Sequence, residues 1–477
     1  MAKFEKNQIV KKSEDFSGWY TDVILKAELA DYAPVKGCMV IRPYGYALWE
    51  RIQEYLGGLI KSRGVQNAYF PIFIPESFLK KEKEHVEGFS PHLAVVTIAG
   101  GEELKEKLVV RPTSETIMYE MYKKWTHSYR DLPVLMNQWN NVVRWEKRTY
   151  LFLRTSEFLW QEGHCAHRDH EDNLKTVRWA LNSYISTYQE LMAMYGIAGV
   201  KSESEKFAGA IKTYTYEMLM PDGKVLQGGT SHDLGQNFSK AFDWSLQDKD
   251  GSQLFPWQNS WGFSTRSIGG LVMAHGDDGG LVLPPKIAPI QVILIPIIQT
   301  PAIKEFCMAK KKELEAEGIR VKIDDREEKS VGWKFNEWEL KGIPCRIEVG
   351  EKELASGELT VFRRDTKEKL KVQNEKFQSK IKNLLDGIQN NLFERNKKFV
   401  EENTHDISNY EKFKDIMKTK KGFIKAFWCE DAGCEAKIKE ETKATTRVLP
   451  LDAKEEKGQC IYCKKPSTHR WYFAQAY

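Results

Sequence analysis

The fold is decided by two charged segments that lie close together in the chain. They are Arg144-Trp-Glu146 and, seven residues later, Arg154-Thr-Ser-Glu-Phe-Leu-Trp-Gln-Glu-Gly-His164. Side chains along a β-strand alternate between its two faces, and the apolar and aromatic pattern predicts strands over 142–146 and 152–158 joined by a loop. In this interpretation Arg144 and Glu146 share one face of a sheet.

An arginine beside a glutamate on the floor of a sheet suits a ligand that carries both phosphate and amine groups. A guanidinium group binds oxyanions through a planar fork, and a carboxylate accepts hydrogen bonds from donors. Unpaired charges among apolar and aromatic neighbours are costly to bury, so these side chains should face a ligand or each other. The alternative is a cross-strand ion pair on a solvated face, which is common in sheets.

Length and composition indicate an ordinary multidomain protein. A chain of 477 residues with 41% hydrophobic and 29% charged residues is too long for one core and should divide into about three domains. The net charge of +5 weakly favours a polyanionic partner without establishing one. The sequence has no run of 18 apolar residues and no apolar signal-peptide core near its beginning. We therefore expect a cytoplasmic protein with no membrane partner.

Residues 1–286 mix helices and strands in an α+β pattern. Apolar residues at helical spacing predict helices over 44–61 and 174–191. Three prolines within 284–289 then mark the clearest boundary in the chain, because proline cannot continue a helix or a central strand.

Beyond this boundary the pattern changes to that of a separate α/β domain. An apolar strand over 290–298, a helix over 303–318 and a second strand over 319–323 form a β-α-β unit. We place this domain at 287–400. A lysine-rich stretch with helical spacing leads from it into a last small module at 401–477.

Four of the eight cysteines form two short knuckles in this last module. Four residues separate Cys429 from Cys434 in the first knuckle, and two residues separate Cys460 from Cys463 in the second. Four thiolates at such spacing suit tetrahedral zinc, and a site filled entirely by sulfur would be structural. The alternative is four reduced structural cysteines. The scattered cysteines are expected to be buried thiols, namely Cys38, Cys165, Cys307 and Cys345.

Three further motifs are ordinary when each is taken alone. Thr113-Ser-Glu115 begins a predicted helix, where its side chains could hold an ammonium group or simply cap the helix. Gly228-Gly-Thr-Ser-His232 is a small-residue turn whose glycines allow close approach of a ligand, although a lone histidine is more often a core residue. Arg266 precedes another segment with helical character.

Taken together, these motifs resemble the three ordered motifs of class II aminoacyl-tRNA synthetases. In detail the chain is similar to the prolyl-tRNA synthetases, and the resemblance covers nearly its whole length. It rests on Thr113-Ser-Glu115, on Arg154-Thr-x-Glu-Phe-Leu-Trp-Gln-Glu-Gly-His164, on Gly229-Thr-Ser-His-x-Leu-Gly235 and on His275-Gly-Asp-x-x-Gly-Leu-Val-Leu-Pro-Pro285. The third motif departs from the family pattern because it lacks the usual repeated glycines before Arg266.

The resemblance implies a multidomain α+β enzyme of the archaeal and eukaryote-like branch. Residues 1–286 would form the class II catalytic domain, an antiparallel sheet flanked by helices. Residues 287–400 would form the α/β anticodon-binding domain, and 401–477 a small α/β zinc-binding domain. No large insertion separates the second and third motifs, which implies that the editing domain of many bacterial members is absent. Family likeness also implies a homodimer.

The same resemblance implies the reaction and its residues. Proline and ATP would form prolyl-adenylate, which the terminal adenosine of tRNA(Pro) would then attack. Arg144 and Arg266 would be the catalytic residues, stabilising charge together with Mg²⁺ on the phosphates. The residues implied for ATP are Arg144, Glu146, Arg154, Thr155, Gln227, Thr230, Ser264 and Arg266. The residues implied for proline are Thr113, Glu115, Arg144, Trp160, Glu162, His164, Phe207 and His232.

In the second domain, the resemblance assigns anticodon reading to Phe335, Glu339, Arg346 and Lys352. Aromatic and charged side chains together suit splayed single-stranded bases, although a solvated helix face is the alternative. A proline pocket cannot strongly exclude the smaller alanine, so mischarging with alanine is also expected.

Two other functions remain open from the sequence. The chain could be another class II synthetase or an adenylate-forming paralogue that uses the same fold with a different amino acid. It could also be a module that binds RNA without catalysis, which is disfavoured because Arg144, Arg154 and Arg266 are all present.

Overall fold

The structure, a computed structural model, describes residues 9–79 and 93–477. Its central feature is an antiparallel sheet with the strand order β9-β10-β11-β14-β8-β7, which confirms the predicted sheet. Its strands are β7 (Val134–Val143), β8 (Glu157–His167), β9 (Ile197–Val200), β10 (Lys212–Leu219), β11 (Val225–Gly235) and β14 (Trp257–Ser264), and the short β3 (Gln66–Asn67) lies parallel to β7.

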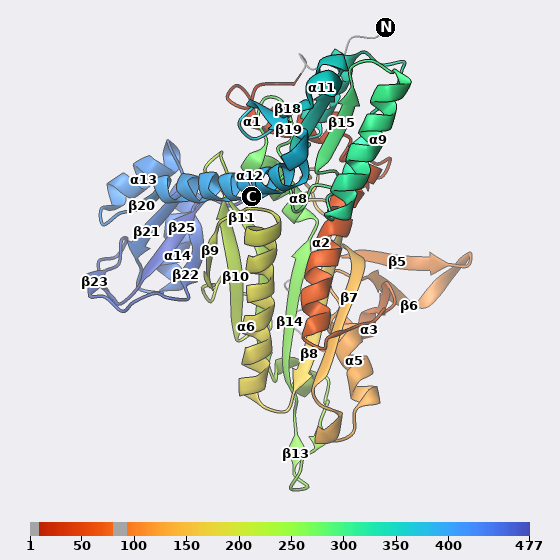
Figure 1. Cartoon of the computed structure of the whole chain (residues 1–477). Helices are drawn as coiled ribbons and strands as arrows, with labels where there is room; N and C mark the ends of the chain where they lie inside the picture. The colour runs from red at the N-terminus through yellow and green to blue at the C-terminus, as the bar shows by residue number, and fades with distance from the viewer. Residues whose placement is uncertain (1–8, 80–92) are drawn as a thin grey trace.

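The two faces of this sheet differ in polarity. On β10, Tyr214 and Tyr216 point into the main hydrophobic core, whereas Thr213 and Glu217 lie on the opposite face because side chains alternate along a strand. The helices α2 (Pro43–Ser62), α6 (His170–Ser186) and α8 (Arg266–His275) contribute buried apolar residues to the same core. Figure 1 shows α6 and α2 lying over one face of the sheet, roughly along its strands. The polar face is left to form a site.

The helices predicted from apolar spacing are confirmed. The stretch 44–61 is α2, which begins at Pro43 with the proline in its first turn, where a missing N–H costs nothing. The stretch 174–191 is α6 together with a short π-helix, Thr187–Leu191.

The strands predicted around the two charged segments are wrong at their inner ends. The first strand ends at Val143 and the second begins at Glu157, so Arg144 and Glu146 lie on the connecting loop. Phe152 in this loop has φ +61, which is incompatible with an extended strand. The positions of Arg144 and Glu146 are therefore set by the conformation of the loop and not by the alternation of side chains along a strand.

Smaller elements surround the sheet. A three-stranded sheet has the order β4-β6-β5, and two hairpins are β1-β2 and β12-β13. These elements and the neighbouring helices are α1 (Phe16–Lys26), β1 (Ala30–Tyr32), β2 (Met39–Ile41), β4 (Phe73–Pro75), α3 (Glu76–Leu79), β5 (Ala94–Ala99), β6 (Glu102–Val110), α5 (Glu115–Trp125), α7 (Asn237–Ala241), β12 (Leu246–Gln247) and β13 (Gln253–Leu254).

The second region confirms the predicted β-α-β unit. Strand β15 pairs in parallel with β16 and β17, and β18 and β19 complete the sheet in antiparallel pairing. Its elements are β15 (Val292–Pro296), α9 (Pro301–Ala316), β16 (Val321–Ile323), α10 (Val331–Leu340), β17 (Cys345–Val349), α11 (Glu351–Ser356), β18 (Glu358–Arg363) and β19 (Lys369–Gln373).

The C-terminal region joins the central sheet, which the sequence did not predict. Its strand β22 pairs with β9 through Leu449↔Val200 and Pro450↔Gly199, so one sheet runs through both regions. A Cβ on Gly199 would lie 2.1 Å from the Leu449 carbonyl oxygen, so only glycine permits this pairing. The elements are β20 (Thr404–Asp406), α13 (Tyr410–Lys418), β21 (Phe423–Phe427), α14 (Ala432–Thr442), β22 (Thr445–Pro450), β23 (Gly458–Gln459), β24 (Pro466–Ser467) and β25 (Arg470–Ala474).

The long helix α12 (Phe377–Glu402) ties the three regions together. Ile381 packs in the core of the second region, Leu392 packs beside Ala193 of the first, and Val400 packs beside Phe423 of the last. Figure 1 shows α12 running from the second region toward the C-terminal one.

The prediction of four buried thiols is wrong for one of the scattered cysteines. Three of the scattered cysteines are buried, but Cys38 is only half-buried because it lies in the short connection between strands β1 and β2. Among the described residues, no helix is long and apolar enough to cross a membrane.

Candidate active site

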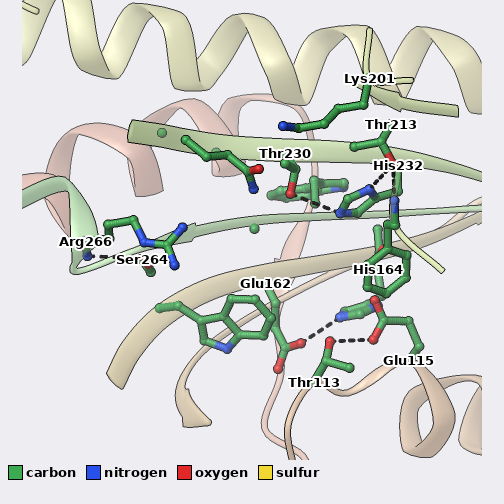
Figure 2. Close-up of a pocket in the computed structure, with 18 of the residues that line it drawn as sticks. Thr113, Glu115, Glu162, His164, Lys201, Thr213, Thr230, His232, Ser264 and Arg266 are labelled. Atoms are coloured by element: carbon green, nitrogen blue, oxygen red, sulfur yellow. Dashed lines mark hydrogen bonds and ion pairs between the residues drawn. The ribbon is translucent and has the colours of Figure 1, made fainter. Parts of the chain in front are cut away.

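A cavity of about 250 Å³ lies on the polar face of the central sheet. Strands β8, β10, β11 and β14 form its floor, and the beginning of α5 and the loop after β7 form its rim. Figure 2 shows the side chains converging on it from both sides. This first cavity is lined by Thr113, Glu115, Arg144, Phe158, Trp160, Glu162, His164, Lys201, Glu205, Phe207, Thr213, Gln227, Gly228, Gly229, Thr230, His232, Ser260, Trp261, Gly262, Ser264 and Arg266.

One end of the cavity is acidic. The Thr113 hydroxyl donates to the Glu115 carboxylate at 2.5 Å, and both side chains are buried. Glu115 is the first residue of α5, where the helix dipole stabilises a negative charge. A buried carboxylate beside a hydroxyl is suited to a cationic amine ligand.

Glu162 is held in place by a dense set of donors. Its carboxylate accepts hydrogen bonds from the Ser114 amide at 3.1 Å and hydroxyl at 2.5 Å, and from the side chains of Gln138 at 3.1 Å and Asn140 at 2.7 Å. The oxygen that accepts from the Ser114 amide, Oε2, also lies 2.9 Å from His164 Nε2. Burial alone would raise the pKa of Glu162, but the hydrogen bonds from His164 and Ser114 bring it below its usual range. Glu162 thus supports its neighbours as a fixed anion.

His164 and Trp160 keep hydrogen-bonding capacity for a ligand. Burial opposes protonation of His164, but the carboxylates of Glu115 and Glu162 raise its pKa overall. The Nδ1 atom of His164 and the Nε1 atom of Trp160 are buried without a hydrogen-bond partner among the described residues. Buried polar groups are rarely left unpaired, so two unpartnered polar atoms in one cavity wall indicate a ligand site.

His232 is held from both of its ring nitrogens. Nδ1 lies 3.0 Å from the Thr213 hydroxyl and Nε2 lies 3.0 Å from the Thr230 hydroxyl. The Phe207 ring stacks on the imidazole with ring centroids 4.4 Å apart. The imidazole therefore forms a rigid wall opposite Glu162 (Figure 2).

The other end of the cavity is cationic. Arg144 Nε donates to the Pro112 carbonyl at 3.0 Å, and the guanidinium lies 5.5 Å from the Phe158 ring centroid and 5.3 Å from that of Trp160. Burial lowers the pKa of Arg144 to about 10, and the nearby Arg266 adds repulsion. Arg144 therefore stays charged at neutral pH and is suited to an oxyanion.

A second, smaller cavity of about 50 Å³ adjoins the cationic end. Arg154 Nε and Glu146 form an ion pair of 3.0 Å there, within the connecting loop rather than across two strands. Arg266 Nε donates to the Leu153 carbonyl at 3.1 Å. This cavity is lined by Arg144, Glu146, Phe152, Leu153, Arg154, Thr155, Phe158, Ser264 and Arg266.

These two cavities contain every residue that the sequence assigned to ATP or proline. The sequence missed other lining residues, notably Lys201, Glu205 and Thr213. Thr213 could have been found from strand alternation with Thr215, whereas Lys201 and Glu205 lie in an irregular stretch after β9 that carries no motif.

The four residues assigned to the anticodon are only partly brought together. Arg346 is buried between the rings of Phe335, at 3.9 Å, and Phe362, at 4.3 Å. Glu339 lies on the same helix as Phe335, one turn further on. Lys352 is exposed on the separate helix α11.

The four knuckle cysteines converge in the C-terminal region. All four sulfur atoms lie within 4.8 Å of one another, and Cys429 Sγ is 3.7 Å from Cys434 Sγ and 3.6 Å from Cys463 Sγ. A tetrahedral zinc with Zn–S bonds of about 2.3 Å requires sulfur atoms about 3.8 Å apart. The geometry therefore fits zinc.

Comparison with known families agrees with this three-region organisation. A family model described as "tRNA synthetase class II core domain (G, H, P, S and T)" matches residues 96–275. The model "Anticodon binding domain" matches 291–384, and "Prolyl-tRNA synthetase, C-terminal" matches 410–477.

Full-length relatives extend the match. Proline–tRNA ligase 2 of Clostridioides difficile (strain 630) is 52% identical over 481 residues, covering 100% of both chains. The proline–tRNA ligase of Natranaerobius thermophilus is 51% identical over 475 residues, covering 98% of each. A crystal structure of prolyl-tRNA synthetase from Cryptosporidium parvum, complexed with halofuginone and AMPPNP, is 43% identical with a TM-score of 0.94, covering 98% of this chain and 99% of that one. The chain therefore belongs to the prolyl-tRNA synthetase family, the class II enzymes that ligate proline to tRNA.

Proposed function

We propose that the first cavity binds proline at its acidic end and ATP at its cationic end. The observation that carries this proposal is that the two cavities adjoin and share Arg144, Phe158, Ser264 and Arg266. An amino acid and a nucleotide placed in them would meet at the guanidinium of Arg144. This is the arrangement that joining a carboxylate to an α-phosphate requires.

At the acidic end, Glu115 and Thr113 hold the imino group of proline. The pyrrolidine ring lies among Trp160, His164 and Phe207, whose aromatic faces suit an apolar ring. Glu162 keeps His164 oriented and favours its charged form, and His232 closes the opposite wall. The two unpartnered nitrogen atoms, Trp160 Nε1 and His164 Nδ1, support a bound ligand at this end.

At the cationic end, Arg144 contacts the α-phosphate and the proline carboxylate, and Arg266 contacts adenine and phosphate. Arg154 holds the γ-phosphate and Glu146 holds the adenine amino group. Binding of ATP therefore separates these two side chains, and their ion pair is exchanged for contacts with the nucleotide. Thr155, Gln227, Thr230 and Ser264 complete the nucleotide site.

The reaction then needs positioning and charge stabilisation rather than a covalent enzyme intermediate. A proline carboxylate oxygen attacks the α-phosphorus, and the bond from that phosphorus to pyrophosphate breaks. Arg144 and Arg266 stabilise the negative charge that develops. The terminal hydroxyl of tRNA(Pro) next attacks the proline carbonyl and releases AMP.

Mg²⁺ fits this site as a companion of ATP. Glu146, the only carboxylate among the residues that line the second cavity, is assigned to adenine, so Mg²⁺ would be held mainly by the substrate phosphates and waters. When bound, it supplies positive charge to the phosphates. The chain's own part is to hold the nucleotide in line through its arginines.

The other two regions have supporting roles in this proposal. Phe335, Glu339, Arg346 and Lys352 read the anticodon of tRNA(Pro), supported by the aromatic sandwich around Arg346. Cys429, Cys434, Cys460 and Cys463 bind one structural zinc. We place the domain boundaries at 286–287 and 400–401, although α12 crosses the second.

We further propose a cytoplasmic homodimer without an editing domain. Apolar side chains are exposed around Pro71 and on the three-stranded sheet, including Tyr69, Phe73, Val95 and Ile98, and burying them would favour association.

The segment between β8 and β14 supports the absence of an inserted editing domain. It forms only α6, its π-helical end, β9 to β11, α7 and one hairpin.

Amino-acid-dependent exchange of pyrophosphate with ATP tests the proposal. Proline should support rapid exchange without tRNA. Alanine, which lacks two of the ring methylenes, should support slower but measurable exchange, because each missing methylene is worth only about 1–3 kcal/mol. Exchange that depends on another amino acid instead of proline would overturn the assignment and favour a paralogue with different specificity.

A further inference from the structure

A buried network of charges joins the C-terminal region to the floor of the first cavity. The carboxylate of Glu217, on β10, accepts two hydrogen bonds from Arg447 of β22. The donors are Nη2, at 2.8 Å, and Nε, at 3.1 Å. On its other side it binds Lys201 Nζ at 2.9 Å. The side chains of Glu217, Lys201 and Arg447 are only 0%, 2% and 6% exposed.

All three charges are satisfied within this network. Thr215 also donates to Glu217 at 2.8 Å, and Arg447 Nη1 lies 3.7 Å from Glu205. Burial alone would raise the pKa of Glu217, but Arg447 and Lys201 hold it at about 2. Because three charges are taken out of water, none can be removed without a large cost to the others.

The network touches the substrate site at two points. Lys201 lines the first cavity, and Figure 2 shows it on the wall opposite Glu162 and Thr113. Glu217 is the direct cross-strand partner of Gln227, which also lines the cavity. Partners in antiparallel strands share a face with their Cβ atoms about 5 Å apart. A displacement of the Glu217 side chain would therefore also displace Gln227 and Lys201.

A further cavity of about 610 Å³ shows how these regions meet. Its lining includes Arg154, Arg266 and Gln227 from the nucleotide end and Arg447 and Tyr477 from the C-terminal region. The C-terminal region thus forms part of the wall behind the nucleotide site.

We propose that Lys201, Glu217 and Arg447 are positioning residues for the nucleotide end of the active site, so that the C-terminal region completes that site. Arg447 fixes the Glu217 carboxylate, and Glu217 in turn fixes Lys201 and the adjacent Gln227. This inference rests on the proposed placement of ATP at the cationic end of the cavity. It predicts that disturbing Arg447 weakens ATP binding far more than proline binding, since Glu115, Glu162 and His164 lie at the other end.

A purely structural role would give a different result. Replacing a buried ionic cluster with apolar residues of similar size often leaves stability unchanged or improved. The apolar triple variant Lys201→Met/Glu217→Leu/Arg447→Met should therefore regain much of the thermal stability lost by Arg447→Met alone. If the network only supports the fold, the triple variant should also regain wild-type kinetics, whereas positioning predicts that its KM for ATP stays high.

The test measures KM for ATP and for proline in proline-dependent pyrophosphate exchange with the full chain. Arg447→Met should raise KM for ATP about tenfold, the effect of losing one charged hydrogen-bonded contact, and should change KM for proline by less than about twofold. If Arg447→Met does not fold, Arg447→Gln carries the same expectation. Arg470→Met is the matched control, because Arg470 lies in the same region and pairs instead with Asp406 and Glu456.

Three results would overturn the inference. They are an unchanged KM for ATP in a folded Arg447 variant, an equal rise in both KM values, and recovery of wild-type kinetics by the triple variant. Failure of the proposed function is distinguishable from these results, because the wild-type chain would then show no proline-dependent exchange.

Discussion

Asp277 accepts two hydrogen bonds from the guanidinium of Arg364, at 2.5 Å from Nη2 and 2.9 Å from Nη1. Asp277 lies just after α8, the helix that begins at Arg266. Arg364 lies in the second region and also donates from Nε to the Glu339 carbonyl at 3.0 Å. One buried arginine thus joins the end of the helix that carries a proposed ATP residue to the helix that carries a proposed anticodon residue.

Removing this charge from Asp277 should loosen the junction between the two regions. Asp277→Asn is expected to lower the free energy of unfolding by about 2–3 kcal/mol, because the buried Arg364 would lose a charged acceptor. Lys367 also pairs with Asp277, at 3.2 Å, but is half exposed, so Lys367→Met should cost at most about 0.5 kcal/mol. Urea unfolding compares the two variants, and equal losses would contradict the ranking.

Glu162 should be far more important for activity than the other glutamate of its strand. Glu162→Gln replaces an acceptor surrounded by donors with a group that is itself a donor, so we expect proline activation to fall by at least about 100-fold. Glu157→Gln is the matched control, because Glu157 is exposed at the start of the same strand. Similar exchange rates for the two variants would exclude the proposed role of Glu162.

The pair of Glu162 and His164 should make stability depend on pH in a defined direction. The pKa of His164 is raised by neighbouring carboxylates, so its contribution is fully present below the pKa of an unfolded histidine, about 6.5, and is lost as pH rises through the folded value. The pKa of Glu162 is lowered, so its contribution is present above about pH 4.3 and is lost as pH falls through the folded value.

Unfolding in urea between pH 6 and 9 measures the histidine part of this effect. Wild-type stability should fall over this range by more than that of His164→Gln, which lacks the titrating group. Parallel curves for the two proteins would show that His164 does not carry the effect.

Zinc should be bound in a ratio of one per chain and should stabilise the C-terminal region. Metal analysis of freshly purified protein tests the stoichiometry, and Cys429→Ser/Cys463→Ser should abolish binding. Removal of zinc should lower the thermal midpoint, because metal binding contributes folding free energy. Cys307→Ser is a suitable control, because Cys307 is buried in the second region away from the knuckles. A metal content well below one in the wild type would refute the zinc site.

Many of the residues that line the two cavities could be singled out from the sequence because they lie in short contiguous motifs. Segments such as the one from Trp160 to His164 carry several chemically distinctive residues on a single strand, so local order is enough to identify them. Lys201 and Arg447 were missed because their proximity depends on pairing between β9 and β22, which are far apart in the chain. No local pattern encodes that pairing.

The loop that carries Glu146 and Arg154 shows a second limit. Alternation along the chain predicted extended strands there, but Phe152 adopts positive φ and is buried in the main core. Tertiary packing of this ring outweighs the local strand preference. The same packing brings Arg154 back toward Glu146.

The central claim is that one cavity joins proline to ATP around Arg144, and proline-dependent pyrophosphate exchange tests it most directly. Arg144→Ala should abolish exchange while leaving binding of tRNA(Pro) intact, whereas Arg148→Ala, an exposed arginine on the same loop, should retain wild-type exchange. Exchange preserved in folded Arg144→Ala would contradict the account.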